Sequence, residues 1–173
     1  MPRIPYFDLA LASPAYLEGL ADRPPLNLYR MLPYAGALAP IFLRMGGAIR
    51  NETVIDPALR EIAIVRVGVL TGADYEVHHH LRLAREAGVS EVKASAIAGG
   101  ADAEIFSPLE NLVLEFTDAL VRDVRASDEL FGRIERELGR EATAELVLAI
   151  GFYLLVSRFL LNFGIEIETP EAA

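Results

Sequence analysis

Residues 59–88 constrain the fold most strongly, because they place charged side chains inside an apolar helical pattern. The first part of this stretch belongs to a predicted helix from Pro57 to Leu70, which is apolar around nearly its whole circumference except at Arg60, Glu61 and Arg66. A helix of this kind is expected at the centre of a domain. Glu61 then points among apolar groups, so its carboxylate either holds a proton or accepts a hydrogen bond from a neighbour.

A turn follows this helix, and the pattern predicts a helical hairpin. Gly72 can end the first helix, and the spacing of Thr71 and Asp74 is that of a capping box that opens a second one. The predicted core-facing positions of the second helix recur at helical spacing and are Val77, Leu81, Ala84 and Gly88.

One histidine of the hairpin is well placed to act together with a carboxylate. Glu76 and His80 lie one helical turn apart and share one edge of the core-facing stripe. His79 is expected on the solvent side and His78 on the other edge, because consecutive helical residues point about 100° apart. The sequence therefore predicts that Glu76 and His80 work as a pair, with Glu61 facing His80 across the hairpin.

This order of residues resembles the carboxymuconolactone decarboxylase / alkylhydroperoxidase-D-like family, best over residues 33–123. A glutamate in a buried helix is followed by a turn, by a histidine nineteen positions later, by Ala-Gly, and by a serine that opens the next helix. The YEVHHH segment is similar to the Tyr-Glu version of this motif in many members. The resemblance implies that Glu61 and His80 are site residues and that the protein is a compact helical domain assembling as trimers or hexamers.

The resemblance is to members that lack the redox thiols. Redox members carry Cys-x-x-Cys on the second helix, four residues ahead of the histidine, and those positions are Ala73 and Glu76 here. The chain contains no cysteine at all. Disulfides, zinc-thiolate sites, iron–sulfur ligation and thiol peroxidase chemistry are therefore excluded.

The composition of the chain indicates which kinds of partner it can bind. A net charge of −9 and a pI near 4.8 argue against nucleic acid, which requires a basic patch. A hydrophobic content of 53% with a mean hydropathy of +0.30 exceeds that of typical soluble domains and suggests buried subunit interfaces, so a homo-oligomer is expected. The length fits a single domain spanning residues 1–173.

The remaining segments are also helical or irregular, so the predicted class is all-α. Residues 1–27 form an irregular arm with one short helix around 14–21, and residues 27–49 form helices interrupted at Pro33 and Pro40. Asp56 and Ser90 are predicted N-caps. Further helices are expected over residues 57–70, 73–88, 90–98, 108–124, 127–139 and 141–163, with a loop over residues 101–107 and an acidic tail.

A cytoplasmic location without membrane contact is expected. The N-terminus has too short an apolar stretch for a signal peptide. In the last helix, the uncharged run from Leu146 to Ser157 has twelve residues, well short of the roughly 20 that span a bilayer.

Each candidate residue also has a purely structural explanation. Glu61 could accept hydrogen bonds from Arg60, Arg66 or a helix end, and His80 could be a core histidine bonded to a carbonyl. Arg66, Tyr75 and Arg158 are the candidate substrate-binding residues, and packing competes with that role for each.

The trio of Glu61, Glu76 and His80 has three interpretations. It could transfer protons, it could form part of an oxygen- and nitrogen-ligated metal site, or it could be the remainder of a redox site in a non-catalytic binding protein. We predict acid/base chemistry, a decarboxylation or isomerisation, on a small carbonyl or carboxylate compound. In this prediction His80 is the principal acid/base, Glu61 is its partner, Glu76 tunes the pair, and no metal or cofactor is required.

Overall fold

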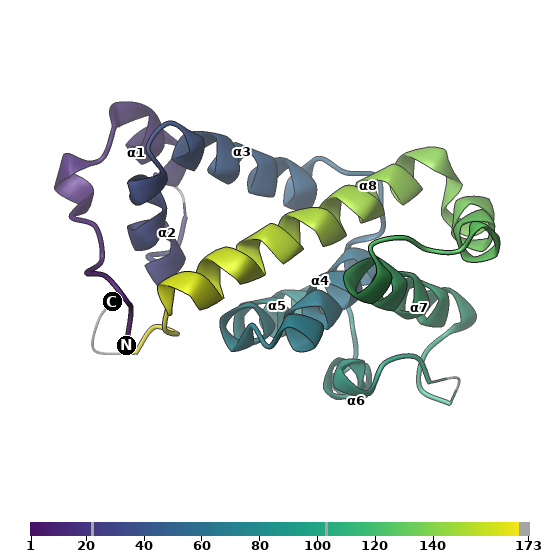
Figure 1. Cartoon of the computed structure of the whole chain (residues 1–173). Helices are drawn as coiled ribbons and strands as arrows, with labels where there is room; N and C mark the ends of the chain where they lie inside the picture. Colours follow the sequence, from purple (N-terminus) through teal and green to yellow (C-terminus); the bar gives the residue numbers. More distant parts are fainter. Residues whose placement is uncertain (22, 103, 170–173) are drawn as a thin grey trace. The chain divides into compact units, whose positions relative to one another are not determined.

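The computed structural model describes residues 1–21, 23–102 and 104–169, and every regular element in these ranges is a helix (Figure 1). Ala103 in the predicted loop and residues 170–173 of the predicted acidic tail lie outside the described residues. The prediction of an all-α fold is confirmed. The chain groups into two compact units, of which the first holds residues 1–52 and 158–173 and the second holds residues 53–157.

The first unit contains short helices. They are the 3₁₀ turn η1 (Leu9–Leu11), α1 (Pro14–Leu20), α2 (Asn27–Met31), the 3₁₀ turn η2 (Leu32–Ala35) and α3 (Leu38–Asn51). Pro33 interrupts the helical region within η2, as predicted. The predicted interruption at Pro40 is wrong, because Pro40 lies in the first turn of α3, where backbone N–H groups have no intrahelical acceptor.

The end of the described chain is fixed to α2 within this unit. The Asn27 side chain donates to the Glu166 carbonyl at 3.0 Å, and the Asn27 backbone N–H donates to the Glu168 carboxylate. Near the N-terminus, the backbone N–H of Arg3 donates to the carbonyl of Phe163 at 2.9 Å. These bonds hold both ends of the described chain against the same unit.

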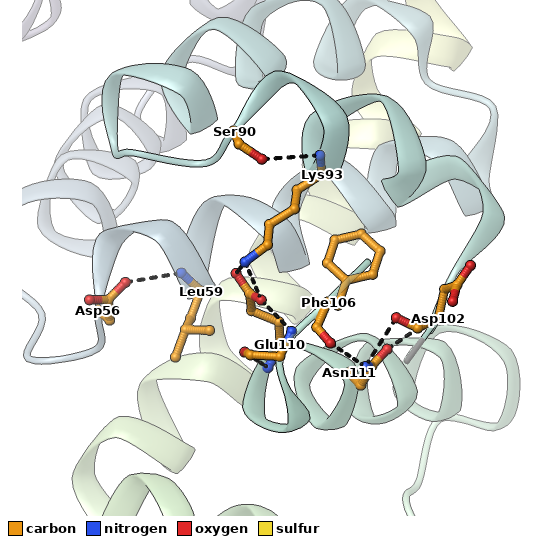
Figure 2. Close-up of polar contacts among 9 residues, drawn as sticks. Asp56, Leu59, Ser90, Lys93, Asp102, Phe106, Glu110 and Asn111 are labelled. Carbon is orange, nitrogen blue, oxygen red and sulfur yellow. Dashed lines mark hydrogen bonds and ion pairs between the residues drawn. The ribbon is translucent and has the colours of Figure 1, made fainter. Parts of the chain in front are cut away.

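The second unit is built around the predicted hairpin of α4 (Pro57–Thr71) and α5 (Asp74–Glu86). Asp56 caps α4, since its carboxylate accepts hydrogen bonds from the backbone N–H groups of Ala58 at 2.8 Å and Leu59 at 3.2 Å (Figure 2). Residues 59–68 of α4 are all buried, which confirms a central helix without a solvent face. Gly72 ends α4 in the left-handed conformation, at φ 69°.

Two details of the hairpin differ from the prediction. Thr71 does not cap α5, because it is still part of α4 and its hydroxyl donates to the carbonyls of Val67 and Gly68; Ala73 occupies the cap position without a side-chain bond. The buried residues of α5 also differ from the predicted core stripe, although Leu81 is partly buried and packs against the core. Of the four members of that stripe only Ala84 is buried, while Tyr75, Glu76 and His80 are the other buried residues of the helix.

The two hairpin helices approach closely at Gly68. A Cβ atom at this position would lie 2.9 Å from Cγ2 of Val77 on α5, closer than real Cβ contacts. The absence of a side chain at Gly68 therefore sets how closely α4 and α5 pack, and with it the distance between side chains that face each other across the hairpin.

The helices that follow are connected by polar contacts (Figure 2). They are α6 (Glu91–Ala96), the 3₁₀ turn η3 (Ile97–Gly99) and α7 (Pro108–Asp123). Ser90 caps α6, as predicted. Lys93 of α6 pairs with Glu110 of α7 at 2.7 Å, and Glu110 also completes a capping box with Ser107. Asn111 bonds the backbone of Asp102 and Phe106, which fixes the described part of the loop before α7.

The last element, α8 (Asp128–Phe163), consists of two helical segments that meet at Gly139, whose φ of 78° is not helical. The hydroxyl of Ser127 accepts from the backbone N–H of Leu130 at 3.2 Å, so both predicted helices and their predicted start are confirmed. By length and composition alone α8 could cross a bilayer, although core helices of soluble proteins pass the same test and 44% of its most apolar window is buried. The absence of membrane contact therefore stays a prediction.

Candidate functional site

Glu61 and His80 meet between the two helices of the hairpin. Nδ1 of His80 lies 2.6 Å from Oε2 of Glu61, and the two residues are only 6% and 2% exposed. Glu61 lies in the second turn of α4, and His80 lies in the second turn of α5. The hairpin turn at Gly72 therefore brings together two residues that are nineteen positions apart. The predicted contact is present.

Glu76 completes a chain of three side chains. Its Oε1 lies 3.0 Å from Nε2 of His80, which is the contact predicted from their one-turn spacing. Glu76 is 4% exposed. The imidazole ring of His80 is therefore held between two buried carboxylates, one on each nitrogen.

A buried arginine, Arg60, extends this chain of three side chains. From the sequence it was expected only as a structural partner of Glu61. Nε of Arg60 lies 3.4 Å from Oε1 of Glu61, and its Nη1 lies 3.3 Å from the Thr53 hydroxyl. Arg60 is 7% exposed. Four charged groups thus alternate in sign in the order Arg60, Glu61, His80 and Glu76. The adjacency of Arg60 and Glu61 in the sequence was the available signal for this contact.

The two carboxylates determine the protonation of His80. Burial by itself lowers the pKa of His80, but the negative charge of Glu76 and the hydrogen bonds to Glu61 and Glu76 outweigh it and raise the pKa to about 9. Both ring nitrogens then carry protons at neutral pH, so Nδ1–H donates to Glu61 and Nε2–H to Glu76. From the sequence, the Glu61 carboxylate was expected either to hold a proton or to accept a hydrogen bond from a neighbour. In the structure it has two such neighbours, His80 and Arg60.

An edge-to-face contact orients the same ring from α8. The ring centroids of His80 and Tyr153 lie 4.8 Å apart at an interplanar angle of 77°. Tyr153 is buried, at 4% exposure. Packing and hydrogen bonds thus both fix the imidazole.

Arg66, a predicted substrate-binding residue, is engaged elsewhere. Its guanidinium makes two bonds to Asp118, at 2.6 and 2.8 Å, and also donates to the carbonyls of Ile97 at 3.1 Å and Ala98 at 2.8 Å. Arg66 is 4% exposed, and these bonds tie α4 to α7 and to the turn after α6. The buried ion pair and the carbonyl bonds thus give Arg66 a structural role, and its predicted role in substrate binding stays a prediction.

The other two predicted substrate-binding residues are Tyr75 and Arg158. Tyr75 is buried, and its ring centroid lies 4.5 Å from that of His79. Arg158 is exposed on α8. Their roles stay predictions.

Of the three consecutive histidines only His80 bonds the two carboxylates, as predicted. The rings of His78 and His79 are in edge-to-face contact, with centroids 5.0 Å apart, and His79 is not on the solvent side. His78 is exposed, whereas His79 is half-buried beside Tyr75. The aromatic face of Tyr75 provides an apolar contact for the His79 ring that the charge pattern of the sequence does not indicate.

Within the described ranges, no three histidine or acidic side chains are grouped so that they could hold a metal ion. In the trio, the two carboxylates bond opposite nitrogens of one imidazole ring, so the three side chains do not converge on a common point. The geometry is that of a proton-transfer chain or a structural charge network.

The fold and the site define a class of protein: an all-α domain organised around a helical hairpin with a buried Glu–His pair. The sequence model of the carboxymuconolactone decarboxylase family matches residues 37–119, which contain the hairpin. The predicted resemblance to this family is therefore confirmed over that region, and the chain lacks the thiol pair because it has no cysteine.

A solved structure shares the fold. It is the crystal structure of a protein of unknown function from Agrobacterium tumefaciens, provisionally described as an antioxidant defence protein AhpD. The similarity has a TM-score of 0.67 at 17% identity and covers 75% of this chain and 89% of that one. No curated protein sequence matches the chain significantly.

Proposed function

We propose that this protein catalyses non-redox acid/base chemistry on a small carbonyl or carboxylate compound, by decarboxylation or isomerisation. The observation that supports this proposal best is the buried chain Glu61–His80–Glu76, in which an imidazole is held between two carboxylates. Its family relationship adds a small-molecule context. The family's thiol chemistry is not available, because the chain has no cysteine.

The contacts suggest a different role for each residue. Glu61 makes the short bond to Nδ1 and anchors the ring, so Nε2 is the nitrogen from which His80 exchanges its proton. A pKa of about 9 makes His80 an acid at neutral pH. Glu76 already accepts the Nε2 proton, so in the proposed step its carboxylate either passes this proton to the substrate or moves away from Nε2.

A balanced step can be written for a β-keto acid. The bond between the α-carbon and the carboxylate breaks, CO₂ leaves, and the electron pair forms an enolate. The enolate carbon takes the proton from His80 Nε2, directly or through Glu76, and the imidazole is reprotonated from solvent. For an isomerisation, the Glu76 carboxylate first removes a proton from the carbon next to the carbonyl, and Nε2–H of His80 protonates the shifted position. The proton on Glu76 then passes to Nε2 of His80, which restores both groups.

A second candidate is a non-catalytic small-molecule-binding or interaction protein. One observation favours it: both nitrogens of His80 already have carboxylate partners, as a structural charge network requires. The assembly as a homo-oligomer, the cytoplasmic location, and the lack of nucleic-acid, membrane, metal and cofactor partners stay predictions.

Turnover by point variants separates the two candidates. A screen of lactones, β-keto acids and related compounds with the wild-type protein should find a substrate, and His80→Gln should lower its kcat by about 10²- to 10⁴-fold. Glu86→Gln on the exposed face of α5 is the control, because Glu86 pairs only with the exposed Arg82 among the described contacts. Unchanged turnover in a folded His80→Gln protein would contradict the role of His80, and no turnover of any compound by the wild-type protein would leave the binding protein as the remaining candidate.

A further inference from the structure

Two arginines on α4 are buried to a similar degree but are bonded very differently. Arg66 makes four hydrogen bonds of 2.6 to 3.1 Å to Asp118 and to two carbonyls. Arg60 makes two, at 3.4 Å to Glu61 and 3.3 Å to Thr53. Arg60 is 7% exposed and Arg66 is 4% exposed, so burial alone does not explain the difference.

Nη2 of Arg60 has no hydrogen bond to any described residue. A buried guanidinium loses its hydration and is stable only if other groups replace it. Arg60 as a whole is 7% exposed, so the side chain is almost completely removed from solvent. The Nη2 edge is therefore a donor that no described residue satisfies.

The charges around Arg60 indicate the kind of partner that this edge accepts. Arg60 and protonated His80 are positive and Glu61 and Glu76 are negative, so the cluster is neutral at neutral pH. A monoanion bound at Arg60 would leave a single net negative charge in a buried setting. A dianion would leave two, at a higher desolvation cost.

We propose that the Nη2 edge of Arg60 is an anion-binding position that takes the carboxylate of a small monocarboxylic acid. The planar guanidinium matches a carboxylate in shape and charge. Arg60 and His80 bind different oxygens of the same Glu61, so an acid held at Arg60 lies at the same charge cluster as the proton donor.

This assignment rests on the proposed function and narrows its substrate. An arginine that holds a carboxylate stabilises it as an anion and disfavours its loss as CO₂. A substrate with a single carboxylate at Arg60 must therefore react elsewhere. Isomerisation next to a carbonyl fits this requirement better than decarboxylation of the same group.

Anion binding can be measured without turnover. The full-length protein with ¹⁵N-labelled arginine is titrated with sodium acetate, and separately with inorganic phosphate, at constant ionic strength near neutral pH. We expect acetate to cause a saturable shift of the Arg60 Nε–H resonance, with weaker binding of phosphate at the same residue. Arg60→Lys should weaken acetate affinity by about tenfold, because it loses the planar pair of donors.

The control changes an arginine on the exposed surface of the same hairpin. Arg82→Gln affects an exposed pair with Glu86 and should leave acetate affinity unchanged. If Arg60 variants fail to fold, the shift of the Arg60 resonance in the wild-type protein still decides the question. No saturable shift, equal acetate affinity after Arg60→Lys, or tighter binding of phosphate would each overturn the proposal.

The two proposals fail in different ways. Acetate binding at Arg60 with no turnover in the substrate screen would contradict the proposed enzyme and leave the anion site in place. Turnover that depends on His80, without acetate binding at Arg60, would support the enzyme and overturn the anion site.

Discussion

Nδ1 of His80 lies 2.6 Å from Oε2 of Glu61, although the two residues are on different helices and nineteen positions apart. The turn at Gly72 and the close approach of α4 and α5 at Gly68 make this distance possible. A short bond between buried groups of opposite charge is strong where water does not compete, so this pair couples the protonation of His80 to the packing of the hairpin.

The carboxylates should control the pKa of His80 unequally. The negative charge of Glu76 is the largest effect that raises this pKa, so Glu76→Gln should lower it more than Glu61→Gln does. Both variants should move the pKa down from about 9. NMR titration of the His80 ring in each variant measures the change, with Glu86→Gln as the surface control. Titration midpoints unchanged from wild type would mean that the trio is not coupled.

Stability should fall as the pH rises from near neutral into the alkaline range. The pKa of His80 is raised from 6.5 to about 9 on folding, so the folded state holds this proton more tightly than the unfolded chain. The resulting stabilisation is complete below about pH 6.5 and is lost as the pH passes about 9. For one isolated site the loss is about 3 kcal/mol. Urea unfolding across this range measures it, and a folded His80→Gln protein should lack this component; a wild-type stability that rises over the same range would contradict the account.

Gly68→Ala should disturb the hairpin directly. The added Cβ would lie 2.9 Å from Cγ2 of Val77 and 3.3 Å from its backbone nitrogen, so α4 and α5 must separate. We expect a loss of about 1 to 3 kcal/mol in the free energy of unfolding, together with a lower pKa of His80 as its bonds lengthen. Gly151→Ala in α8 is the matched control, since its Cβ would meet no atom within 4 Å. It should be neutral or stabilise by up to about 1 kcal/mol; equal effects of the two changes would refute the packing argument.

Glu145 should be needed to hold the segment that precedes α4. Its Oε2 accepts the backbone N–H groups of Val54 and Ile55, each at 2.9 Å. Glu145→Gln should cost about 1 to 3 kcal/mol, because bonds to a charged acceptor are stronger than bonds to an amide. Faster hydrogen exchange at the amides of Val54 and Ile55 is the specific readout, and Glu141→Gln on the exposed surface of α8 is the control. Protection that stays at the wild-type level would show that the carboxylate does not hold this segment.

Local spacing predicted much of the fold. Capping residues such as Asp56 and Ser90, and the break at Gly139, act within a few residues, so the start and end of the main helices could be read from the sequence. The Glu76–His80 contact follows from helical spacing in the same way. The site's principal pair also required the hairpin, which the apolar first helix and Gly72 indicated.

Contacts with distant segments could not be predicted. The pairing of Arg66 with Asp118, 52 residues away, depends on how α7 packs, and it leaves Arg60 as the arginine at the cluster. The buried face of α5 is wider than predicted for a related reason. Ala84 lies in the core and Leu81 packs against it, as apolar periodicity indicated, but ion pairing allowed Glu76 and His80 to be buried as well.

The most direct test of the account is the titration of His80 in the wild-type protein. ¹⁵N NMR of its imidazole distinguishes a ring with two protonated nitrogens from a neutral one. We expect both ring nitrogens of His80 to be protonated at neutral pH, and the ring to titrate with a midpoint near pH 9. A neutral ring at pH 7, or a midpoint at or below the ordinary value of 6.5, would contradict this expectation.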